Sequence, residues 1–370
     1  MRVLSFSAEH FRNVGAASLS FSDGVNLLYG ENAQGKTNIL EAIYLFARGR
    51  SFRTADEKEL VGFGAEGFYL TLDYEDADGA QRMEYAAFGR ERKRTKNGVR
   101  FSRAAEMLGH FRAVLFTPED LAMIKEGPEL RRAFLNVAVS QCDPGYVRIY
   151  ARYKTLLENR NALLRAAKQG KYVDDRELFA FSDEMADAAA QIRQTRAGYV
   201  ERLGRLSVPF LDELSDGRER IGVRYLSDVG EEIDEPSAVR AEYRRVFTEN
   251  IERERGAGTS LYGVQRDDLA ISVNGVSVRD YGSQGQQRSA VLALKLAEGE
   301  ATREITGEHP VFLFDDVMSE LDERRRSFLL TAAKGRQTIM TSCELREDLL
   351  GSLSGAVRLF HVCGGEYERR

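Results

Sequence analysis

Two short motifs near opposite ends of this chain resemble the two halves of a nucleotide site, and they restrict the fold more than any other feature. Near the N-terminus, Gly30–Thr37 (GENAQGKT) fits the phosphate-binding loop pattern GxxxxGK[ST]. A buried-strand pattern at Val25–Tyr29 precedes the loop, and an apolar periodicity over Thr37–Ala47 predicts a helix after it. This context argues against a chance glycine-rich turn, because strand, loop and helix together make an anion cradle.

Residues of this loop have separate predicted roles. Lys36 is expected to reach the β- and γ-phosphates of ATP, which also makes it a catalytic candidate, and the Thr37 hydroxyl is expected to take one position around Mg²⁺. Backbone N–H groups of the loop are expected to wrap the phosphates. The predicted ATP-contacting residues of this segment are Gly30, Glu31, Asn32, Ala33, Gln34, Gly35, Lys36, Thr37 and Asn38.

The second motif is a pair of acids that follows a predicted strand at Val311–Phe314. A buried strand would deliver Asp315 to the Mg²⁺ shell. Asp316, one position further, is a candidate for the base or the positioning group of the attacking water. An acid pair after a strand is also a common turn signal, but the phosphate loop upstream favours the catalytic interpretation.

A glycine-containing turn at Ser283–Arg288 (SQGQQR) opens a predicted helix over Gln286–Glu300. Such a turn is a second anion cradle, and Ser283, Gly285 and Gln286 are predicted to meet a γ-phosphate. One chain does not need two cradles for one phosphate, so the second is expected to serve the ATP of a partner copy across a two-fold axis. The simpler interpretation is a helix N-cap.

Charge and composition limit the remaining function classes. The net charge of −5 means that DNA binding needs a local basic surface. Such a cluster precedes the hairpin signal Asn97-Gly98, where the candidates for DNA contact are Arg92, Lys93, Arg94 and Lys96. A sheet edge protected by charge is the alternative. No apolar run predicts a membrane span, no signal peptide is evident, and three scattered cysteines support no zinc site, so a cytoplasmic location is expected.

Periodicity predicts three segments: 1–125 and 263–370, both of α/β character, and a mainly helical segment at 126–262. Apolar residues recur at helical spacing over 146–163 and again over 178–199, and 168–171 can form a turn between them. Two interpretations stay open for these helices, a projecting arm or an ordinary bundle core.

Taken together, the motifs resemble the RecF family, bacterial recombinational-repair ATPases that are related to SMC proteins. The resemblance rests on Phe11-Arg12-Asn13, Gly49–Arg53, Phe116–Leu121, Gly127-Pro128 with Arg131-Arg132, Ser283–Arg288 and Asp315–Asp322. It implies an α/β fold, an ABC-type P-loop head split in sequence with an inserted helical arm. It also implies nucleotide contacts from Arg12 and Asn13 and a dimer-facing loop at Ser319–Asp322.

The sequence departs from the family and ABC-head patterns in several places, and the glutamine of the usual Q-loop is not evident near Phe116–Asp120. Gly263–Asp268 contains Val264-Gln265 where the family has Pro-His, and Thr341-Ser342 stands where ABC heads have a switch histidine. Arg50 and Arg53 either stabilise charge during ATP hydrolysis or cap the preceding helix.

The resemblance implies an ATP-dependent protein that binds duplex and gapped DNA in recombinational repair and replication restart. It implies a homodimer closed by ATP, a weak DNA-linked ATPase, help in loading the recombinase at single-stranded gaps, and the partners RecR and RecO. An ATP-gated adaptor that marks DNA sites without catalysis is the alternative. A transporter subunit is disfavoured, because the chain has a helical arm and lacks a Leu-Ser-Gly-Gly-Gln segment.

Overall fold

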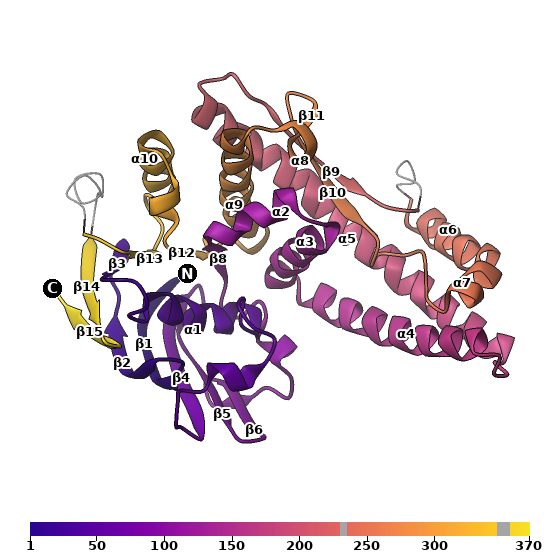
Figure 1. Ribbon diagram of the computed structural model, residues 1–370, viewed down its shortest axis with the longest axis horizontal. Helices are drawn as coiled ribbons and strands as arrows, with labels where there is room; N and C mark the ends of the chain where they lie inside the picture. The colour runs from indigo at the N-terminus through magenta and orange to yellow at the C-terminus, as the bar shows by residue number, and fades with distance from the viewer. Residues whose placement is uncertain (230–234, 346–355) are drawn as a thin grey trace. The chain divides into compact units, whose positions relative to one another are not determined.

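The computed structural model describes residues 1–229, 235–345 and 356–370. The chain forms two compact units (Figure 1). The first, here called the head, contains Met1–Leu121, Pro209–Glu219 and Arg288–Arg370. The second, here called the helical unit, contains Ala122–Val208 and Arg220–Gln287.

A six-stranded sheet in the order β15-β14-β3-β13-β12-β8 forms the centre of the head. Strand β3 (Val25–Tyr29) lies between two strands from the C-terminal part of the chain and pairs in parallel with both. Continuous burial of β12 (Val311–Phe314) is typical of a parallel strand covered on both faces. The predicted split head is therefore confirmed. The other strands are β8 (Ala113–Phe116), β13 (Thr338–Ser342), β14 (Val357–Cys363) and β15 (Glu366–Arg369).

Helices pack on this sheet through apolar side chains. Phe116, Phe312 and Phe314 form a core with side chains of α9 (Gln284–Thr306) and α10 (Glu323–Ala332). Helix α1 (Lys36–Arg48) follows β3 and buries most of its length, as its apolar pattern predicted. Short 3₁₀ turns complete the head at η1 (Glu57–Leu60), η2 (Ala104–Met107), η3 (Pro118–Leu121) and η4 (Val317–Glu320).

A second sheet of the head is antiparallel, with the order β2-β1-β4-β5-β6-β7. The predicted hairpin turn at Asn97-Gly98 is confirmed, because it joins β6 to β7 and both residues have positive φ, 50° and 80°. The strands are β1 (Arg2–Phe11), β2 (Val14–Ser20), β4 (Gly67–Asp76), β5 (Gly79–Phe88), β6 (Glu91–Lys96) and β7 (Val99–Arg100).

The helical unit is built on two long helices, α4 (Pro144–Lys168) and α5 (Asp175–Ser215). Hydrogen bonds join Tyr146 to Arg196 and Arg160 to Ser182, so the two helices run antiparallel, and the predicted hairpin is confirmed. They are not a bare arm, since further helices pack on them. The remaining helices are α2 (Ala122–Lys125), α3 (Pro128–Cys142), α6 (Pro236–Glu249), α7 (Ile251–Ala257) and α8 (Val278–Tyr281).

The compact units differ in three places from the segments expected at 1–125, 126–262 and 263–370, and the first is residues 122–125, which belong to the helical unit. Strand β10 (Asp268–Val273) belongs to the helical unit, because it pairs along its whole length with β9 (Ile221–Leu226) and more briefly with β11 (Val276–Ser277). The last turns of α5 belong to the head, where Leu214 joins the core around β12. Within the described ranges, no helix is long and apolar enough to cross a membrane.

Candidate nucleotide-binding site

The predicted phosphate loop joins β3 to α1, and two glycines make its path possible. Gly30 and Gly35 have φ of 153° and 108°, a region that side chains rarely adopt. A Cβ atom on Gly30 would lie 2.2 Å from the Val362 carbonyl oxygen. The Lys36 side chain is buried under the loop, where its Nζ donates to the carbonyl oxygens of Gly30 and Glu31 at 2.5 and 2.6 Å. The lysine therefore holds the loop closed around its own ammonium group.

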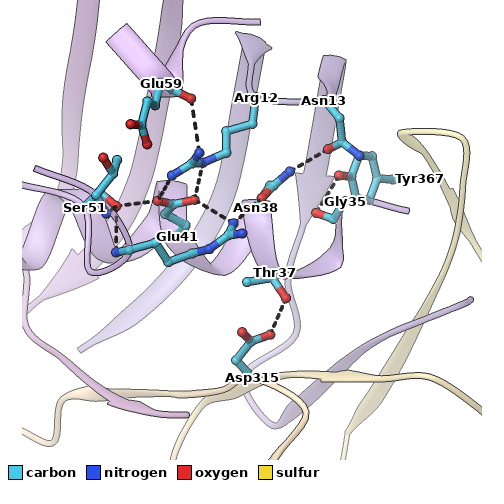
Figure 2. Close-up of polar contacts among 12 residues, drawn as sticks. Arg12, Asn13, Gly35, Thr37, Asn38, Glu41, Ser51, Glu59, Asp315 and Tyr367 are labelled. Carbon is cyan, nitrogen blue, oxygen red and sulfur yellow. Dashed lines mark hydrogen bonds and ion pairs between the residues drawn. The ribbon is translucent and has the colours of Figure 1, made fainter. Parts of the chain in front are cut away.

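Residues of the second motif meet this loop at one carboxylate oxygen. The Thr37 hydroxyl donates to Oδ1 of Asp315 at 2.7 Å (Figure 2). The Thr341 hydroxyl donates to the same atom at 2.9 Å. Burial raises the pKa of Asp315 above its usual value, and the two hydroxyl donors oppose that shift. A hydroxyl and a carboxylate at this spacing fit the oxygen ligands that Mg²⁺ takes beside nucleotide phosphates.

Asp316 follows in a left-handed conformation, with φ of 50°. Its backbone N–H donates to the Thr341 hydroxyl at 2.9 Å. The Cys343 thiol donates to Asn32 Oδ1 of the phosphate loop at 2.9 Å and to Asp316 Oδ2 at 3.4 Å. Burial and the Asp316 carboxylate raise the pKa of Cys343, so the thiol stays protonated at neutral pH and can act as a donor. The sequence prediction did not include Cys343.

One cavity of about 640 Å³ unites most of the predicted residues, and its size suits a small ligand. Of the predicted residues, its lining includes Arg12, Asn13, Asn32, Ala33, Gly35, Lys36, Thr37, Asn38 and Asp316. Gly30 and Glu31 contact Lys36 instead, and the Gln34 side chain accepts from the Gly364 N–H at 2.6 Å. The residues that complete the lining are Arg53, Glu59, Val61, Phe63 and Thr341.

Residues 283–287 of the Ser283 segment lie in the helical unit, at the start of α9. Ser283 and Gln286 form a reciprocal cap, in which the Ser283 hydroxyl accepts from the Gln286 N–H and the Gln286 side chain accepts from the Ser283 N–H. The helix start therefore has the N-cap structure that the simpler interpretation expected. Contacts of Ser283, Gly285 and Gln286 with a γ-phosphate of a partner copy stay a prediction.

Comparison with known proteins assigns the family. The family model for the N-terminal domain of RecF, RecN and SMC proteins matches residues 2–363. The DNA replication and repair protein RecF of Macrococcus caseolyticus is 35% identical over 367 residues, which cover 99% of each chain. The chain belongs to the RecF family.

Other members agree with this assignment. RecF of Limosilactobacillus fermentum is 40% identical over 91% of each chain. A solved structure of the recombination mediator protein RecF with ATP, from the RecFOR pathway, has a TM-score of 0.92 and 36% identity over 100% of this chain and 97% of that one. An SMC head bound to the C-terminal winged-helix domain of ScpA has a TM-score of 0.58 at 15% identity, which shows a shared ABC-type head fold.

At one departure from the RecF pattern, the structure shows a structural contact. Gln265, which stands in the Pro-His position, accepts a hydrogen bond from the Tyr153 hydroxyl and donates to the Tyr262 carbonyl oxygen at 2.7 Å. Gln265 thus links α4 to the segment before β10 inside the helical unit. At another departure, Thr341 contacts Asp315 and Asp316, as described above.

Three of the four cations proposed for DNA contact in this RecF-family chain are already paired. Arg92 and Arg94 bind the Glu57 carboxylate at 2.5 and 2.9 Å, and Lys93 binds Glu84 at 3.0 Å. Among the residues that the structure describes, Lys96 has no carboxylate partner within ion-pair distance. A local sequence pattern cannot show the pairing of Arg92 and Arg94, because Glu57 lies far away along the chain.

Proposed function

We propose that this RecF-family chain is an ATP-dependent DNA-binding protein of recombinational repair and replication restart. In this proposal, ATP and Mg²⁺ bind in the head cavity, two copies close on duplex or gapped DNA, and slow hydrolysis reopens them. The hydrogen bond between Thr37 and Asp315 supports it most strongly, since it joins two motifs from distant parts of the chain at atoms suited to Mg²⁺.

The proposed catalytic roles follow from the contacts of each side chain. Lys36 would turn its ammonium group from the loop carbonyls to the β- and γ-phosphates, and Thr37 and Asp315 would hold Mg²⁺. When bound, the ion would neutralise charge on the transferred phosphate. Asp316 would orient the attacking water, with its carboxylate held by the Cys343 thiol.

The DNA-binding part of the proposal rests on the basic hairpin at β6 and β7. Arg92, Lys93 and Arg94 already share their charge with carboxylates, so they are expected to contribute less than Lys96. RecR and RecO are the proposed partners in recombinase loading, because the similar solved structure is described as part of the RecFOR pathway.

Fluorescence anisotropy of labelled plain and gapped duplexes, with and without ATP and Mg²⁺ at fixed salt, tests this function. We expect tight binding only with ATP, and a preference for the gapped duplex would locate specificity in this chain. Binding that is indifferent to ATP would contradict the closing dimer. ATP turnover measured with and without DNA separates the ATPase from the non-catalytic adaptor, since the adaptor should show no stimulation.

The trans arrangement predicts a specific defect for Ser283→Arg. Ser283 is exposed at the start of α9, so an arginine there should fold but block a partner's γ-phosphate. We expect the variant to bind ATP as a monomer and to show no ATP-dependent mass increase in light scattering. Ser237→Arg adds the same side chain at another exposed helix start and should dimerise normally. A normal mass increase for Ser283→Arg would overturn the arrangement.

A further inference from the structure

A buried carboxylate lies beside the nucleotide cavity, and the Gly49–Arg53 motif is built around it. Glu41, on α1, has a fully buried side chain. It accepts two hydrogen bonds from Arg12, from Nε at 2.6 Å and from Nη2 at 2.7 Å. Arg53 Nη1 lies 3.3 Å from Glu41 Oε2, and the Ser51 hydroxyl donates to Glu41 Oε1 (Figure 2). Four donors from three side chains therefore meet at one buried carboxylate.

Burying a charge at this position is costly unless it is paired and hydrogen-bonded. The contacts of Glu41 meet that requirement, and the Arg12 pair has the bidentate form that fixes orientation as well as energy. Two guanidinium groups share one carboxylate, so the cluster of Glu41, Arg12 and Arg53 carries a net charge of +1. Both arginines line the cavity, and the carboxylate lies behind them.

Glu41 also shapes the loop that presents Arg53. The Ser51 hydroxyl donates to Glu41 and accepts from the backbone N–H groups of Arg53 and Thr54, at 2.9 and 3.1 Å. Through Ser51, the carboxylate fixes the turn that follows α1. From this turn, Arg53 Nη1 donates a hydrogen bond to Asn38 Oδ1 at 2.8 Å. Arg50 does not line the cavity, which favours Arg53 as the residue of this motif that acts there.

A continuous series of hydrogen bonds connects this cluster to the phosphate loop. Asn38 receives the Arg53 bond and donates to Asn13 Oδ1 at 2.6 Å. Asn13 in turn donates to the Ala33 carbonyl oxygen at 3.1 Å. Side chains of α1, the turn after it and the β1–β2 connection are thus linked along one wall of the cavity (Figure 2). A change at Glu41 should reach the loop through these bonds.

We infer that Glu41 is a positioning residue that aims the guanidinium groups of Arg12 and Arg53 at the phosphates of a nucleotide. The inference rests on the proposed function, because it assumes that this cavity binds ATP. Glu41 would act by fixing the orientation of these two side chains. Without its carboxylate, both guanidinium groups would stay near the site, but they would no longer be held pointing toward the phosphates.

A comparison of Glu41→Gln with Glu59→Gln separates orientation from charge. Glu59 lines the same cavity and is exposed, and its contact with Arg12 is made by its backbone carbonyl. Each substitution removes one negative charge beside a predicted anion site, so electrostatics alone should make both variants bind ATP as well as or better than the wild type. Orientation predicts instead that Glu41→Gln binds ATP about tenfold more weakly while Glu59→Gln does not.

The readout is the Kd of a fluorescent ATP analogue, with unlabelled ATP and adenosine as competitors and with the melting temperature measured alongside. If ATP competes poorly for the variant but adenosine competes normally, the defect lies in the contacts with the phosphates, as the inference expects. A general loosening of the cavity should weaken the binding of both competitors. Ser51→Ala keeps the carboxylate charge and should weaken ATP binding in the same direction, which preserves the test if Glu41→Gln folds poorly.

Two further outcomes keep this inference distinct from the proposed function. If Lys36→Ala loses ATP binding while Glu41→Gln and Ser51→Ala keep the wild-type Kd, the role of Glu41 is refuted and the nucleotide site stands. If Lys36→Ala keeps wild-type binding, the nucleotide site itself is wrong, and the role of Glu41 is refuted with it.

Discussion

We expect Lys36→Ala to weaken ATP binding by roughly 10- to 150-fold, which corresponds to the loss of about 1.5–3 kcal/mol from a hydrogen bond made by a charged group. The Lys36 ammonium group is buried beneath the loop and already donates to two loop carbonyl oxygens. Its removal therefore takes away a phosphate donor and also leaves those carbonyl oxygens without their partner. Titration of a fluorescent ATP analogue measures the change.

Lys58→Ala is the matched control for Lys36→Ala. It removes the same charge from the head at an exposed position that does not line the cavity, so its Kd for ATP should stay within about twofold of the wild type. Equal losses in the two variants would mean that net charge, rather than the phosphate loop, controls nucleotide affinity.

The largest expected effect on stability comes from the helical unit, at Glu254→Ala. Glu254 and Arg160 form an ion pair at 2.6 Å in which both side chains are 0% exposed. The substitution leaves the Arg160 guanidinium buried without its counter-charge, although Ser182 and Ser260 still accept hydrogen bonds from it. Removing one partner of such a pair costs about 3–5 kcal/mol. We expect the urea unfolding transition of this unit to shift to lower concentration accordingly.

A pair on the same helix whose carboxylate is exposed provides the comparison for Glu254→Ala. Glu252 contacts Arg255 at 3.1 Å with its side chain 79% exposed, so Glu252→Ala should change stability by about 0–1 kcal/mol. A loss of less than about 1 kcal/mol for Glu254→Ala would show that the helical unit relaxes around Arg160. Circular dichroism at matched protein concentration suits both variants.

Local patterns predicted those parts of the fold that depend on near neighbours in sequence. A run of four apolar residues predicted the strand at Val311–Phe314, and strand, loop and helix signals predicted the phosphate loop and α1. The hairpin at Asn97-Gly98 followed from turn chemistry, because both residues adopt positive φ. Such signals need no knowledge of tertiary contacts.

Tertiary contacts decided what the sequence could not show. Glu41 lies within the apolar pattern of α1, and its contacts with Arg12, Arg53 and Ser51 explain a buried carboxylate there. Cys343 reaches Asn32 and Asp316 because β13 pairs with β3 in a register that brings the ends of the two strands together. In the same way, Glu57 on a distant 3₁₀ turn forms ion pairs with two cations of the hairpin.

The order of strands in the head sheet has a consequence for synthesis on the ribosome. By the time residue 287 has been made, all residues of the helical unit exist, and this unit can fold while translation continues. Within the described residues, strand β3, which carries the phosphate loop, has two neighbours, the strands at residues 338–342 and 357–363. During most of translation the loop therefore lacks the sheet that supports it. The nascent chain is expected to gain its nucleotide site at one of the last steps of folding. A chain stopped before residue 338 should have a folded helical unit but no head that binds nucleotide.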